Sequence, residues 1–346
     1  MKILSVCPMD RVINTCLHRH NILTKLANGI DAVNTAEKSN SIWYRIANKL
    51  FSYGLPIRLP DSSGANKKMK EFVFRNKYDI VWIDKGLTIN KETLLLIKEK
   101  SPETKIVNYG TDNMALRHNQ SQNYLECIPL YDFHFIPRRP HISDTMRHLG
   151  AKKVILLNKS FESSFHYPRN LTTAEKQKFG DDVGFIGSWE KERCDSVLYL
   201  VEHGIKVKVF GDNKWQKYKH YHINLKVDTG LYSEDYAKAL HAFKISLCFL
   251  RKINFDQQTS RTMEIPACGG FMLAERTQEH LSLFEEGKEA EFFSSNEELL
   301  QKCKYYLEHE EERKTIAQAG LLRCKTSGYS NKDTVKKMIQ ICMSRE

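Results

Sequence analysis

The sequence predicts an α/β protein with two doubly wound domains in tandem. Short β-branched or aromatic runs alternate with helical or polar stretches, and the alternation starts again after a polar link at 163–181. Strand, helix and strand in succession are typical of βαβ units, which build parallel sheets. The length of 346 residues supports two domains, because a single hydrophobic core usually stops growing at a smaller size.

The predicted strands form two series along the chain. The first series is KILSVCP at 2–8, YDIVWID at 78–84, TKIVNYG at 104–110, DFHFIP at 132–137 and KKVILLN at 152–158. The second series is DVGFIGS at 182–188, IKVKVFG at 205–211, ISLCFL at 245–250, GGFMLAE at 269–275 and AEFFS at 290–294. Helices are expected near 90–100, 193–203, 233–243, 296–308 and 311–323.

This order of elements defines the predicted domains. An N-terminal Rossmann-like domain should span 1–168 and a second one 169–329, and a last helix within 330–346 should cross back to the first. The apolar residues of that helix recur on one side, which suits docking on another domain. Open sheets bind ligands at the carboxyl ends of their strands, so we expect the two domains to face each other across a ligand-binding cleft.

Composition narrows the class of protein. Hydrophobic residues make up 41% of the chain, which is enough for two cores, and no apolar run is long enough to span a membrane. The opening MKILSVCPMD reads as a strand and not as a signal peptide, because it lacks a long apolar region and a small-residue cleavage site. The nine cysteines stand singly, without a C-x-x-C pair, which indicates reduced thiols in the cytoplasm.

The formal net charge of +11 indicates a negatively charged partner. Nucleic acid, an anionic membrane surface and phosphorylated ligands are the usual partners of such a chain. Nucleic acid is disfavoured, because the basic residues are spread among acids, with no zinc-binding spacing, RGG tract or helix-turn-helix pattern. Phosphorylated ligands and a membrane surface are left as the expected partners.

The segment 41–59 favours a membrane surface. It reads SIWYRIANKLFSYGLPIRL, with apolar residues at helical spacing and with Arg45 and Lys49 between them. This is the pattern of a basic amphipathic helix that lies on a membrane. The alternative is a surface helix whose apolar side packs on its own domain.

The stretch FDQQTSRTMEIPACGG at 255–270 is the strongest candidate for a binding site. It lies between two predicted strands, so it should form a loop and then a helix over about 259–268. The free backbone N–H groups and the positive dipole end of a helix N-terminus suit phosphate. Arg261 in the first turn can bind a phosphate through two N–H groups.

Two acids in the same stretch complete the candidate site. Glu264, one turn further along the predicted helix, can accept hydrogen bonds from a ribose diol. Asp256 precedes Glu264 by eight positions and lies in the predicted loop, so both acids can face one cavity. The spacing alone is weak evidence, but its position between two predicted strands favours a site.

The chain resembles a known family over most of its length. The run TSRTMEIPACGGFMLAERTQEHLSLFEEGKEAEFFSSNEELLQKCKYYLEHEEERKTIAQAG at 259–320 resembles the C-terminal domain of the CgeB-like, spore-maturation-type glycosyltransferases. These are similar to the wider GT-B group of nucleotide-sugar glycosyltransferases. The likeness continues upstream in DVGFIGSWEKERCDSVLYLVEHGIKVKVFG at 182–211, and more loosely in YDIVWIDKGLTINKETL and IVNYGTDNMALRHNQS. The resemblance implies a GT-B fold, with the donor site in the second domain and the acceptor site in the first.

The resemblance also implies roles on the donor side. Retaining GT-B enzymes use an E-x7-E element, whose second acid holds the nucleotide ribose and whose first holds the donor sugar. Glu264 matches the second acid, and Asp256 stands in place of the first, one methylene shorter than a glutamate. Gly187 and Ser188 match the glycine-rich turn after the first strand of the donor domain, and Arg193 resembles an arginine just beyond it. The other donor-side candidates are Thr259, Ser260 and Arg261.

The acceptor-side candidates lie in the first domain. GTDNM at 110–114 resembles a DDM-type element of the family, with Asp112 kept and an asparagine in place of a second acid. Lys85 and Arg138 match basic positions of the family, although 138 is more usually a lysine. His118 lies in the same region and could act as a base.

The implied activity is glycosyl transfer from a nucleotide-sugar, such as a UDP- or GDP-sugar, to a hydroxyl of a glycan or glycolipid acceptor. No metal or other cofactor is expected, because a helix dipole, backbone amides and arginines can stabilise the leaving diphosphate. With Asp256 and Glu264 as the acid pair, transfer should retain the donor configuration, whereas inversion would need a base such as Asp112. The alternatives are a nucleotide-sugar epimerase of GT-B fold and a non-catalytic sugar-nucleotide binding protein. The expected location is the cytoplasm, including the inner face of the cell membrane.

Overall fold

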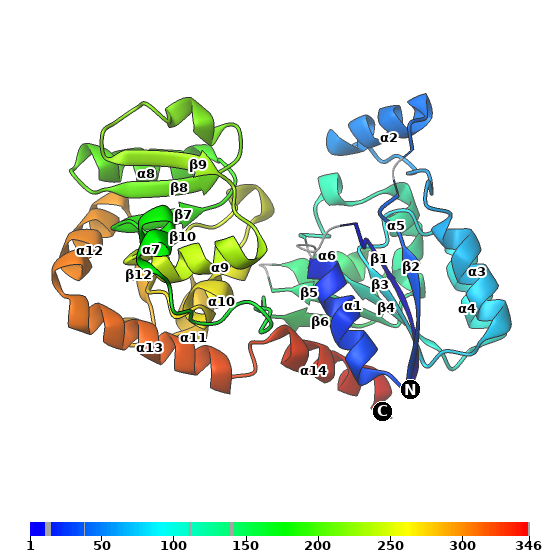
Figure 1. The fold of residues 1–346 in the computed structure, drawn as a ribbon. Coiled ribbons are helices and arrows are strands. Elements are labelled where there is room, and N and C mark those ends of the chain that lie inside the picture. Colours follow the sequence, from blue (N-terminus) through cyan, green and yellow to red (C-terminus); the bar gives the residue numbers. More distant parts are fainter. Residues whose placement is uncertain (11–14, 38, 111, 139–140, 345–346) are drawn as a thin grey trace. The chain divides into compact units, whose positions relative to one another are not determined.

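Two compact units make up the protein. The first is formed by Met1–Asn158 together with Asn331–Glu346, and the second by Lys159–Ser330. The structure is a computed structural model and describes residues 1–10, 15–37, 39–110, 112–138 and 141–344. Each unit holds a parallel six-stranded sheet with helices packed around it (Figure 1). The predicted α/β class with two doubly wound domains is therefore confirmed.

The first unit is built on a sheet with the strand order β2-β1-β3-β4-β5-β6. Its strands are β1 (Lys2–Cys7), β2 (Gly29–Asn34), β3 (Ile80–Asp84), β4 (Lys105–Tyr109), β5 (Phe133–Pro137) and β6 (Val154–Leu157). Every residue of β3 is buried, as expected for a central strand that helices cover on both faces. From β1 the chain adds β2 on one side and then crosses to add β3 and the later strands on the other. The strands β1 and β3 are therefore parallel neighbours at the point where the strand order reverses.

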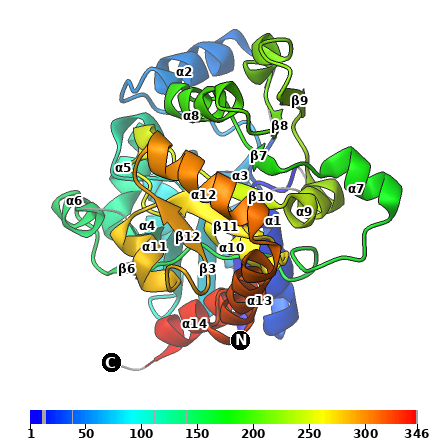
Figure 2. The same cartoon turned by 90° about the vertical axis from the view of Figure 1, so that its left-hand side faces the viewer.

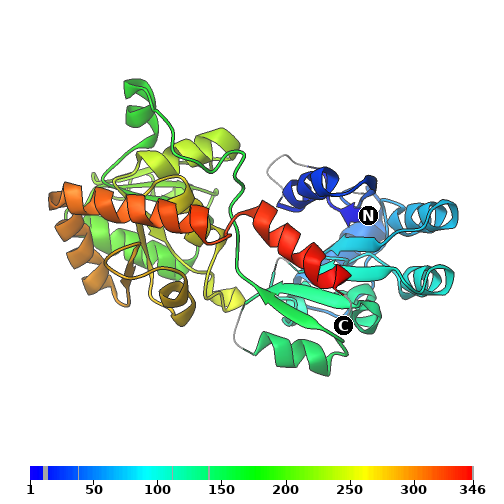
Figure 3. The same cartoon turned by 90° about the horizontal axis from the view of Figure 1, so that it is seen from below.

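The helices of the first unit cover both faces of this sheet. They are α1 (Thr15–Leu26), α2 (Ile42–Ser52), α3 (Ala65–Arg75), α4 (Lys91–Lys100), α5 (Gln122–Cys127), α6 (Ile142–His148) and α14 (Asn331–Met343), with short 3-10 turns η1 (Arg117–Asn119) and η2 (Ile128–Leu130). The helix α14 packs beside α1 (Figure 3). Its residues Val335, Met338 and Cys342 share a core with Ile3 and Trp82. The last helix therefore belongs to the first unit.

The second unit has the strand order β12-β11-β10-β7-β8-β9. Its strands are β7 (Val183–Ile186), β8 (Val207–Gly211), β9 (Leu225–Thr229), β10 (Ile245–Cys248), β11 (Met272–Glu275) and β12 (Glu291–Phe293). Its helices are α7 (Thr173–Phe179), α8 (Lys191–Glu202), α9 (Ser233–Ala242), α10 (Ser260–Ala267), α11 (Gln278–Leu283), α12 (Asn296–Glu308) and α13 (Glu310–Thr326), with 3-10 turns η3 (Trp215–Tyr218) and η4 (Lys252–Asn254).

Two apolar layers hold the second unit together. On one face of the sheet, α8 and α12 pack on a core that contains Phe185 and Phe249. On the opposite face, α9, α10 and α11 pack on a core that contains Ile186 and Met272 (Figure 2). Phe185 and Ile186 are consecutive residues of β7 and point to opposite faces, as the pleat of a strand requires. The end of β7 is thus fixed from both sides.

The boundary between the units lies before residue 159, and not after 168 as predicted. Phe161 is the reason, because it packs in the core of the second unit and pairs with Ser330 in an isolated parallel bridge. The polar link at 163–181 therefore runs within the second unit. No helix in the described part of the chain is both long and apolar enough to cross a membrane.

Candidate functional site

The second sheet changes its direction of growth between β7 and β10. From β7 the chain adds β8 and β9 on one side, and then crosses to add β10, β11 and β12 on the other. The two strands are parallel neighbours, with Val183 opposite Ile245. Open α/β sheets bind ligands at the carboxyl ends of two strands that meet in this way. The donor-side residues predicted from the sequence all follow one of these two strands.

Arg261 is held against the turn that follows β7. Its Nε donates a hydrogen bond to the carbonyl oxygen of Ile186 at 2.6 Å, and its guanidinium carbon lies 5.5 Å from the centre of the Phe185 ring. A Cβ atom on Gly187 would overlap Arg261 Nη2, so the absence of a side chain lets the guanidinium lie here. Nη1 and Nη2 make no hydrogen bond to any residue that the structure describes. The group is therefore oriented through Nε, and its two terminal nitrogens could donate to a ligand.

Gly187→Ala should weaken the binding of the sugar nucleotide predicted from the sequence about fivefold, because the new methyl group displaces the Arg261 guanidinium. The same Cβ would lie 2.8 Å from Phe185 Cζ, so we also expect a loss of about 1 kcal/mol in the free energy of unfolding from overpacking. Calorimetry at a temperature where the variant stays folded measures the affinity. Gly230→Ala is the matched control, since its Cβ would meet its nearest neighbour, Tyr232 Oη, at 3.6 Å. Equal affinities for the two variants would contradict the placement of Arg261.

A second arginine, Arg193, is buried at the same switch point and is only 2% exposed. Its Nη1 donates to the carbonyl oxygen of Ser188 at 3.0 Å and its Nε to that of Leu250 at 3.3 Å, so it joins the ends of β7 and β10. Burial, and then the charge of Arg261, lowers the pKa of Arg193 to about 10. Its Nη2 has no hydrogen-bond partner and lies 3.8 Å from Glu190 Oε2. Two neighbouring cations with unused donors form a site that an anion would stabilise.

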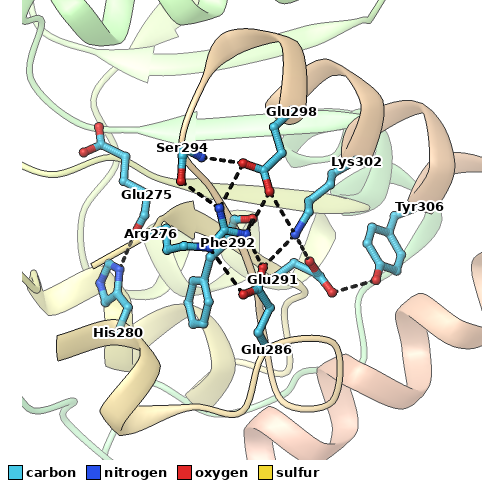
Figure 4. Close-up of polar contacts among 10 residues, drawn as sticks. All are labelled: Glu275, Arg276, His280, Glu286, Glu291, Phe292, Ser294, Glu298, Lys302 and Tyr306. Carbon is cyan, nitrogen blue, oxygen red and sulfur yellow. Dashed lines mark hydrogen bonds and ion pairs between the residues drawn. The ribbon is translucent and has the colours of Figure 1, made fainter. Parts of the chain in front are cut away.

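The start of α10 is tied to the end of β11 by a chain of hydrogen bonds. Thr259 caps the helix, because its hydroxyl accepts from the backbone N–H of Arg261 at 3.2 Å. The Thr259 N–H donates to the Thr262 hydroxyl at 3.0 Å, and that hydroxyl lies 2.9 Å from His280 Nε2. His280 Nδ1 lies 2.6 Å from the carbonyl oxygen of Glu275 (Figure 4). A carbonyl can only accept, so Nδ1 carries the proton and Nε2 accepts from Thr262.

This chain of hydrogen bonds predicts a loss of stability in acid. Burial lowers the pKa of His280 from about 6.5 to about 4, so the unfolded chain binds a proton first as the pH falls. Neutral His280 therefore makes its full contribution to the free energy of unfolding above pH 6.5. This contribution decreases by about 3 kcal/mol as the pH falls to about 4. Urea unfolding of the wild type and His280→Phe between pH 7 and pH 4 should show this change in their difference. Parallel pH curves would contradict a neutral His280.

Glu264 lies one turn further along α10 and is oriented by two side chains. Its Oε2 accepts a hydrogen bond from the Tyr236 hydroxyl at 2.5 Å, and its Oε1 lies 3.9 Å from His166 Nε2. His166 Nδ1 accepts from the backbone N–H of Glu162 at 3.0 Å, so the proton of the neutral ring lies on Nε2, toward Glu264. The Glu264 side chain is 13% exposed, which leaves part of the carboxylate accessible to a ligand. Sequence analysis did not identify Tyr236 or His166.

Asp256 and Ser260 are the remaining residues predicted for the donor side. Asp256 lies in the loop after β10, and its N–H donates to the carbonyl oxygen of Arg251 at 3.2 Å. Phe255 before it has a φ of 51°, which non-glycine residues rarely adopt and which often marks functional loops. Ser260 is the first residue of α10. As predicted, Asp256 lies in the loop and Glu264 lies on the helix, and both are half-buried.

Arg276 and Lys302 join three glutamates beside β11 and β12, and one of these glutamates, Glu291, is the first residue of β12 (Figure 4). Arg276 Nη2 donates to Glu298 Oε1 at 2.8 Å and also bonds Glu286, and Lys302 bonds Glu286 at 2.8 Å and Glu291. Hydrogen bonds from Arg276 lower the pKa of Glu298 to about 2. All three guanidinium nitrogens of Arg276 have partners within this network. Arg276 therefore stabilises the fold, unlike the two arginines beside β7, which keep unused donors.

A cavity of about 440 Å³ lies beside this network. It is lined by Glu192, Asp195, Ser196, Lys252, Glu275, Arg276, Phe293, Ser294, Ser295 and Asn296. None of the residues predicted from the sequence is among them. The residues predicted for the donor site thus lie along the β7–β10 switch point, and this cavity has a separate lining.

Lys85 and Asp112 of the first unit form an ion pair, with 3.0 Å between Nζ and Oδ2. They follow β3 and β4, which are neighbours in the sheet. Lys85 has a φ of 61° and Gly86 a φ of 75°, so two successive residues adopt the left-handed conformation in the turn after β3. Burial disfavours the charge of Lys85, but the Asp112 carboxylate raises its pKa above the ordinary value. The structure therefore brings these two predicted residues together.

The other acceptor-side candidates lie along the same edge of the first sheet. Arg138 is exposed and follows β5, the next strand after β4, and its backbone N–H donates to Leu157 at 2.9 Å. His118 is half-buried in η1, and a Cβ atom on Gly54 would lie 3.8 Å from its Cβ. The loop after β4 therefore lies beside the segment that follows α2.

Comparison with known proteins identifies the fold. Residues 194–340 match the family model described as "Glycosyl transferase-like", which covers less than half of the chain and lies mainly in the second unit. No curated protein sequence matches the chain significantly. Solved structures, in contrast, match almost the whole chain.

Three solved structures illustrate the match. The Anabaena protein HepE in complex with UDP-glucose has a TM-score of 0.63 at 12% identity, over 99% of this chain and 100% of that one. Sucrose-phosphate synthase from Thermosynechococcus elongatus has a TM-score of 0.66 at 10% identity, over 99% and 98%. The protein has the GT-B fold. A Listeria monocytogenes protein assigned as a UDP-N-acetylglucosamine 2-epimerase matches this GT-B chain with a TM-score of 0.55 at 11% identity, over 98% and 94%.

Each of the two Rossmann-like sheets of this GT-B protein carries its own group of candidate residues. Gly187, Arg193, Arg261 and Glu264 lie at the β7–β10 switch point of the second unit, and Lys85 and Asp112 follow neighbouring strands of the first. The residue types of the second unit suit a phosphorylated ligand with a hydroxylated sugar, because they combine two arginines, a helix N-terminus and a carboxylate.

Proposed function

We propose that this GT-B protein is a glycosyltransferase that moves a sugar from a UDP-sugar to a hydroxyl group of an acceptor. The observation that carries the proposal is the pair of Arg193 and Arg261 at the β7–β10 switch point, with unused N–H donors. A diphosphate is the kind of anion that two arginines and a helix N-terminus bind. The match of 194–340 to a glycosyl transferase-like family and the fold shared with HepE, solved with UDP-glucose, support this assignment. The resemblance of 259–320 to CgeB-like enzymes agrees with it.

The two arginines would stabilise the leaving group. In the proposed reaction, the acceptor oxygen forms a bond to the anomeric carbon of the donor sugar while the bond from that carbon to the diphosphate oxygen breaks. Negative charge then develops on the diphosphate, where Arg193 and Arg261 supply N–H donors, together with the Ser260 N–H and the Thr259 hydroxyl at the start of α10. The proton of the acceptor hydroxyl passes to the leaving diphosphate or to a carboxylate base. UDP and the glycosylated acceptor are the products.

Glu264 would hold the nucleotide ribose. Its Oε2 is fixed by Tyr236, so Oε1 and the remaining lone pairs face the ligand with a defined orientation. Asp256 would contact the donor sugar from the loop after β10, and the turn at Gly187 and Ser188 would lie along the diphosphate. These roles assign recognition of the donor to the second unit.

We infer a retaining, metal-independent reaction. Retention follows from the roles of Asp256 and Glu264 as an acid pair, and Asp112 is the base to consider if the configuration inverts. The ion pair with Lys85 holds Asp112 in place, so the same pair would also orient an acceptor hydroxyl. His118 and Arg138 are further acceptor contacts in this scheme. The acceptor is a glycan or a lipid-linked glycan in the cytoplasm.

A nucleotide-sugar epimerase is the second candidate, because the Listeria protein assigned that activity shares the fold. An epimerase needs no acceptor and converts one free sugar nucleotide into another, which chromatography detects. A non-catalytic binding protein would bind the nucleotide and release no product. Transfer to an added acceptor therefore separates the three functions.

The first test is a thermal-shift panel with UDP, GDP, dTDP, CDP, CMP and their common sugars, with and without EDTA. A shift of several degrees with UDP or a UDP-sugar that EDTA leaves unchanged is the expected result. A shift that EDTA abolishes would overturn the metal-independent reaction. No shift with any nucleotide would overturn the donor-site assignment.

A further inference from the structure

The exposed side of α2 carries large apolar residues. Ile42, Trp43 and Ile46 are 76%, 56% and 45% exposed, whereas Ala47 is the buried residue of this helix. The helix stands at the periphery of the first unit (Figure 1). The apolar stripe is therefore divided: Ala47 and the half-buried Leu50 pack on the first unit, whereas Ile42, Trp43 and Ile46 remain exposed in the part of the chain that the structure describes. Such an arrangement is unfavourable in water unless something else covers it.

The same side of α2 is flanked by positive charge. Ile46 lies one turn from Ile42 and from Trp43, so these three residues share one side of the helix. Arg45 and Lys49 lie one turn from Ile42 and Ile46, and both are exposed. The whole segment 41–59 contains no aspartate or glutamate. An apolar stripe with basic neighbours complements a partner that has an apolar interior and anionic groups at its surface.

We propose that α2 binds the surface of an anionic phospholipid bilayer through Ile42, Trp43 and Ile46. A helix with this pattern lies in the plane of the interface, with its apolar side below the headgroups and its cations at the phosphates. Tryptophan is enriched at this depth because one end of the indole is apolar and the other can donate a hydrogen bond. The three apolar side chains all project from one helix, so they can enter the flat surface of a bilayer together.

The position of α2 also indicates the class of acceptor, an inference that rests on the proposed function. The segment after α2 is hydrogen-bonded to α5, which follows the loop that contains Asp112. Ile57 accepts a hydrogen bond from the backbone N–H of Gln122 at 3.0 Å, and the Leu59 N–H donates to Asn123 Oδ1 at 2.8 Å. Gly54 packs beside His118. A bilayer under α2 would therefore lie next to the acceptor side, which favours an acceptor whose hydroxyl is attached to a membrane lipid.

The test is co-sedimentation of the full-length protein with vesicles. Wild type is compared on phosphatidylcholine vesicles and on vesicles of phosphatidylcholine mixed with phosphatidylglycerol, at low and high salt. We expect binding only to the anionic vesicles, with a loss of at least fivefold in Ile42→Asp/Ile46→Asp and a similar loss in Arg45→Glu/Lys49→Glu. Ile223→Asp is the matched control, because Ile223 is 94% exposed in the second unit and should have no effect.

Several outcomes would overturn the proposal. Equal vesicle binding by wild type and the α2 variants would do so, as would the absence of binding to anionic vesicles. A shift from dimer to monomer in the α2 variants, seen by ultracentrifugation without vesicles, would assign the face to a second copy of the chain. The α2 variants should keep the wild-type thermal stability, since these positions are exposed.

Nucleotide binding separates this proposal from the proposed function. UDP titrations of wild type and the α2 variants should give the same affinity, because α2 carries none of the donor-side residues. Vesicle binding without UDP binding would sustain the membrane surface and reject the glycosyltransferase. UDP binding without vesicle binding would reject the membrane surface and sustain the proposed donor site. The transfer assay can support both the membrane surface and the glycosyltransferase. The α2 variants should then lose transfer to a lipid-linked acceptor in vesicles but keep transfer to a soluble acceptor.

Discussion

Replacing Arg261 with alanine is expected to weaken the binding of UDP about 100-fold, with little change in folding stability. The terminal nitrogens of Arg261 bond no residue that the structure describes, and hydrogen bonds between charged groups contribute about 1.5–3 kcal/mol each. Loss of both would raise the dissociation constant by about two orders of magnitude. The KM for the donor should rise in parallel. Calorimetric titration with UDP and urea unfolding of the same preparation provide the two measurements.

Two further variants make this test specific. Arg261→Lys keeps the charge but loses the two-pronged geometry, so it should recover only part of the affinity. Arg323→Ala is the matched control, because Arg323 also donates through Nε to a main-chain carbonyl, that of Leu283 at 3.0 Å, but lies on α13. Wild-type affinity in a folded Arg261→Ala variant would reject its role in binding phosphate.

Glu264→Gln should reduce donor affinity and transfer at least tenfold. A carboxylate can accept from both hydroxyls of a ribose diol while Oε2 accepts from Tyr236. In the glutamine variant one oxygen remains for Tyr236, and the NH₂ group that replaces the other oxygen is a donor where the ribose needs an acceptor. The loss of a charge-assisted hydrogen bond accounts for a factor of about ten or more. Calorimetry with UDP and a transfer assay measure the two effects.

Glu312→Gln provides the matched control for this change. Its carboxylate also accepts from a tyrosine, Tyr305, at 2.8 Å, but on an exposed part of the second unit. We therefore expect wild-type affinity from it. Unchanged affinity in Glu264→Gln would show that this carboxylate does not bind the donor.

Most of the strands could be predicted because they are buried on both faces and read as continuous apolar runs. The strands β2 and β9, with the sequences GIDAVN and LKVDT, were not predicted. Both lie at an edge of a sheet, where part of the strand faces solvent and its residues alternate or turn polar. The domain boundary was misplaced for a similar reason, since composition marks the polar link but not the packing of Phe161.

Two kinds of signal predicted the candidate residues: residues close together in the sequence, and the resemblance to a family for those further apart, such as Gly187 and Asp112. The loop and helix with Asp256, Arg261 and Glu264 were identified from their place between two strands. The residues that orient them were not, because Tyr236 and His166 reach Glu264 from other segments of the chain. No local pattern marks a tyrosine or histidine that contacts a carboxylate on another element. Periodicity likewise predicted α2 but could not decide which side of it is exposed.

The burial of Arg193 costs folding stability at a position where the proposed function needs a cation. A buried cation that lacks one hydrogen-bond partner lowers the stability of the ligand-free protein, and an apolar side chain of similar size would fill the same space with less penalty. The proposed binding of a diphosphate would account for an arginine that is buried at this cost. In the proposed function, the desolvation of one binding group would already be complete when the anion arrives, which would lower the cost of binding.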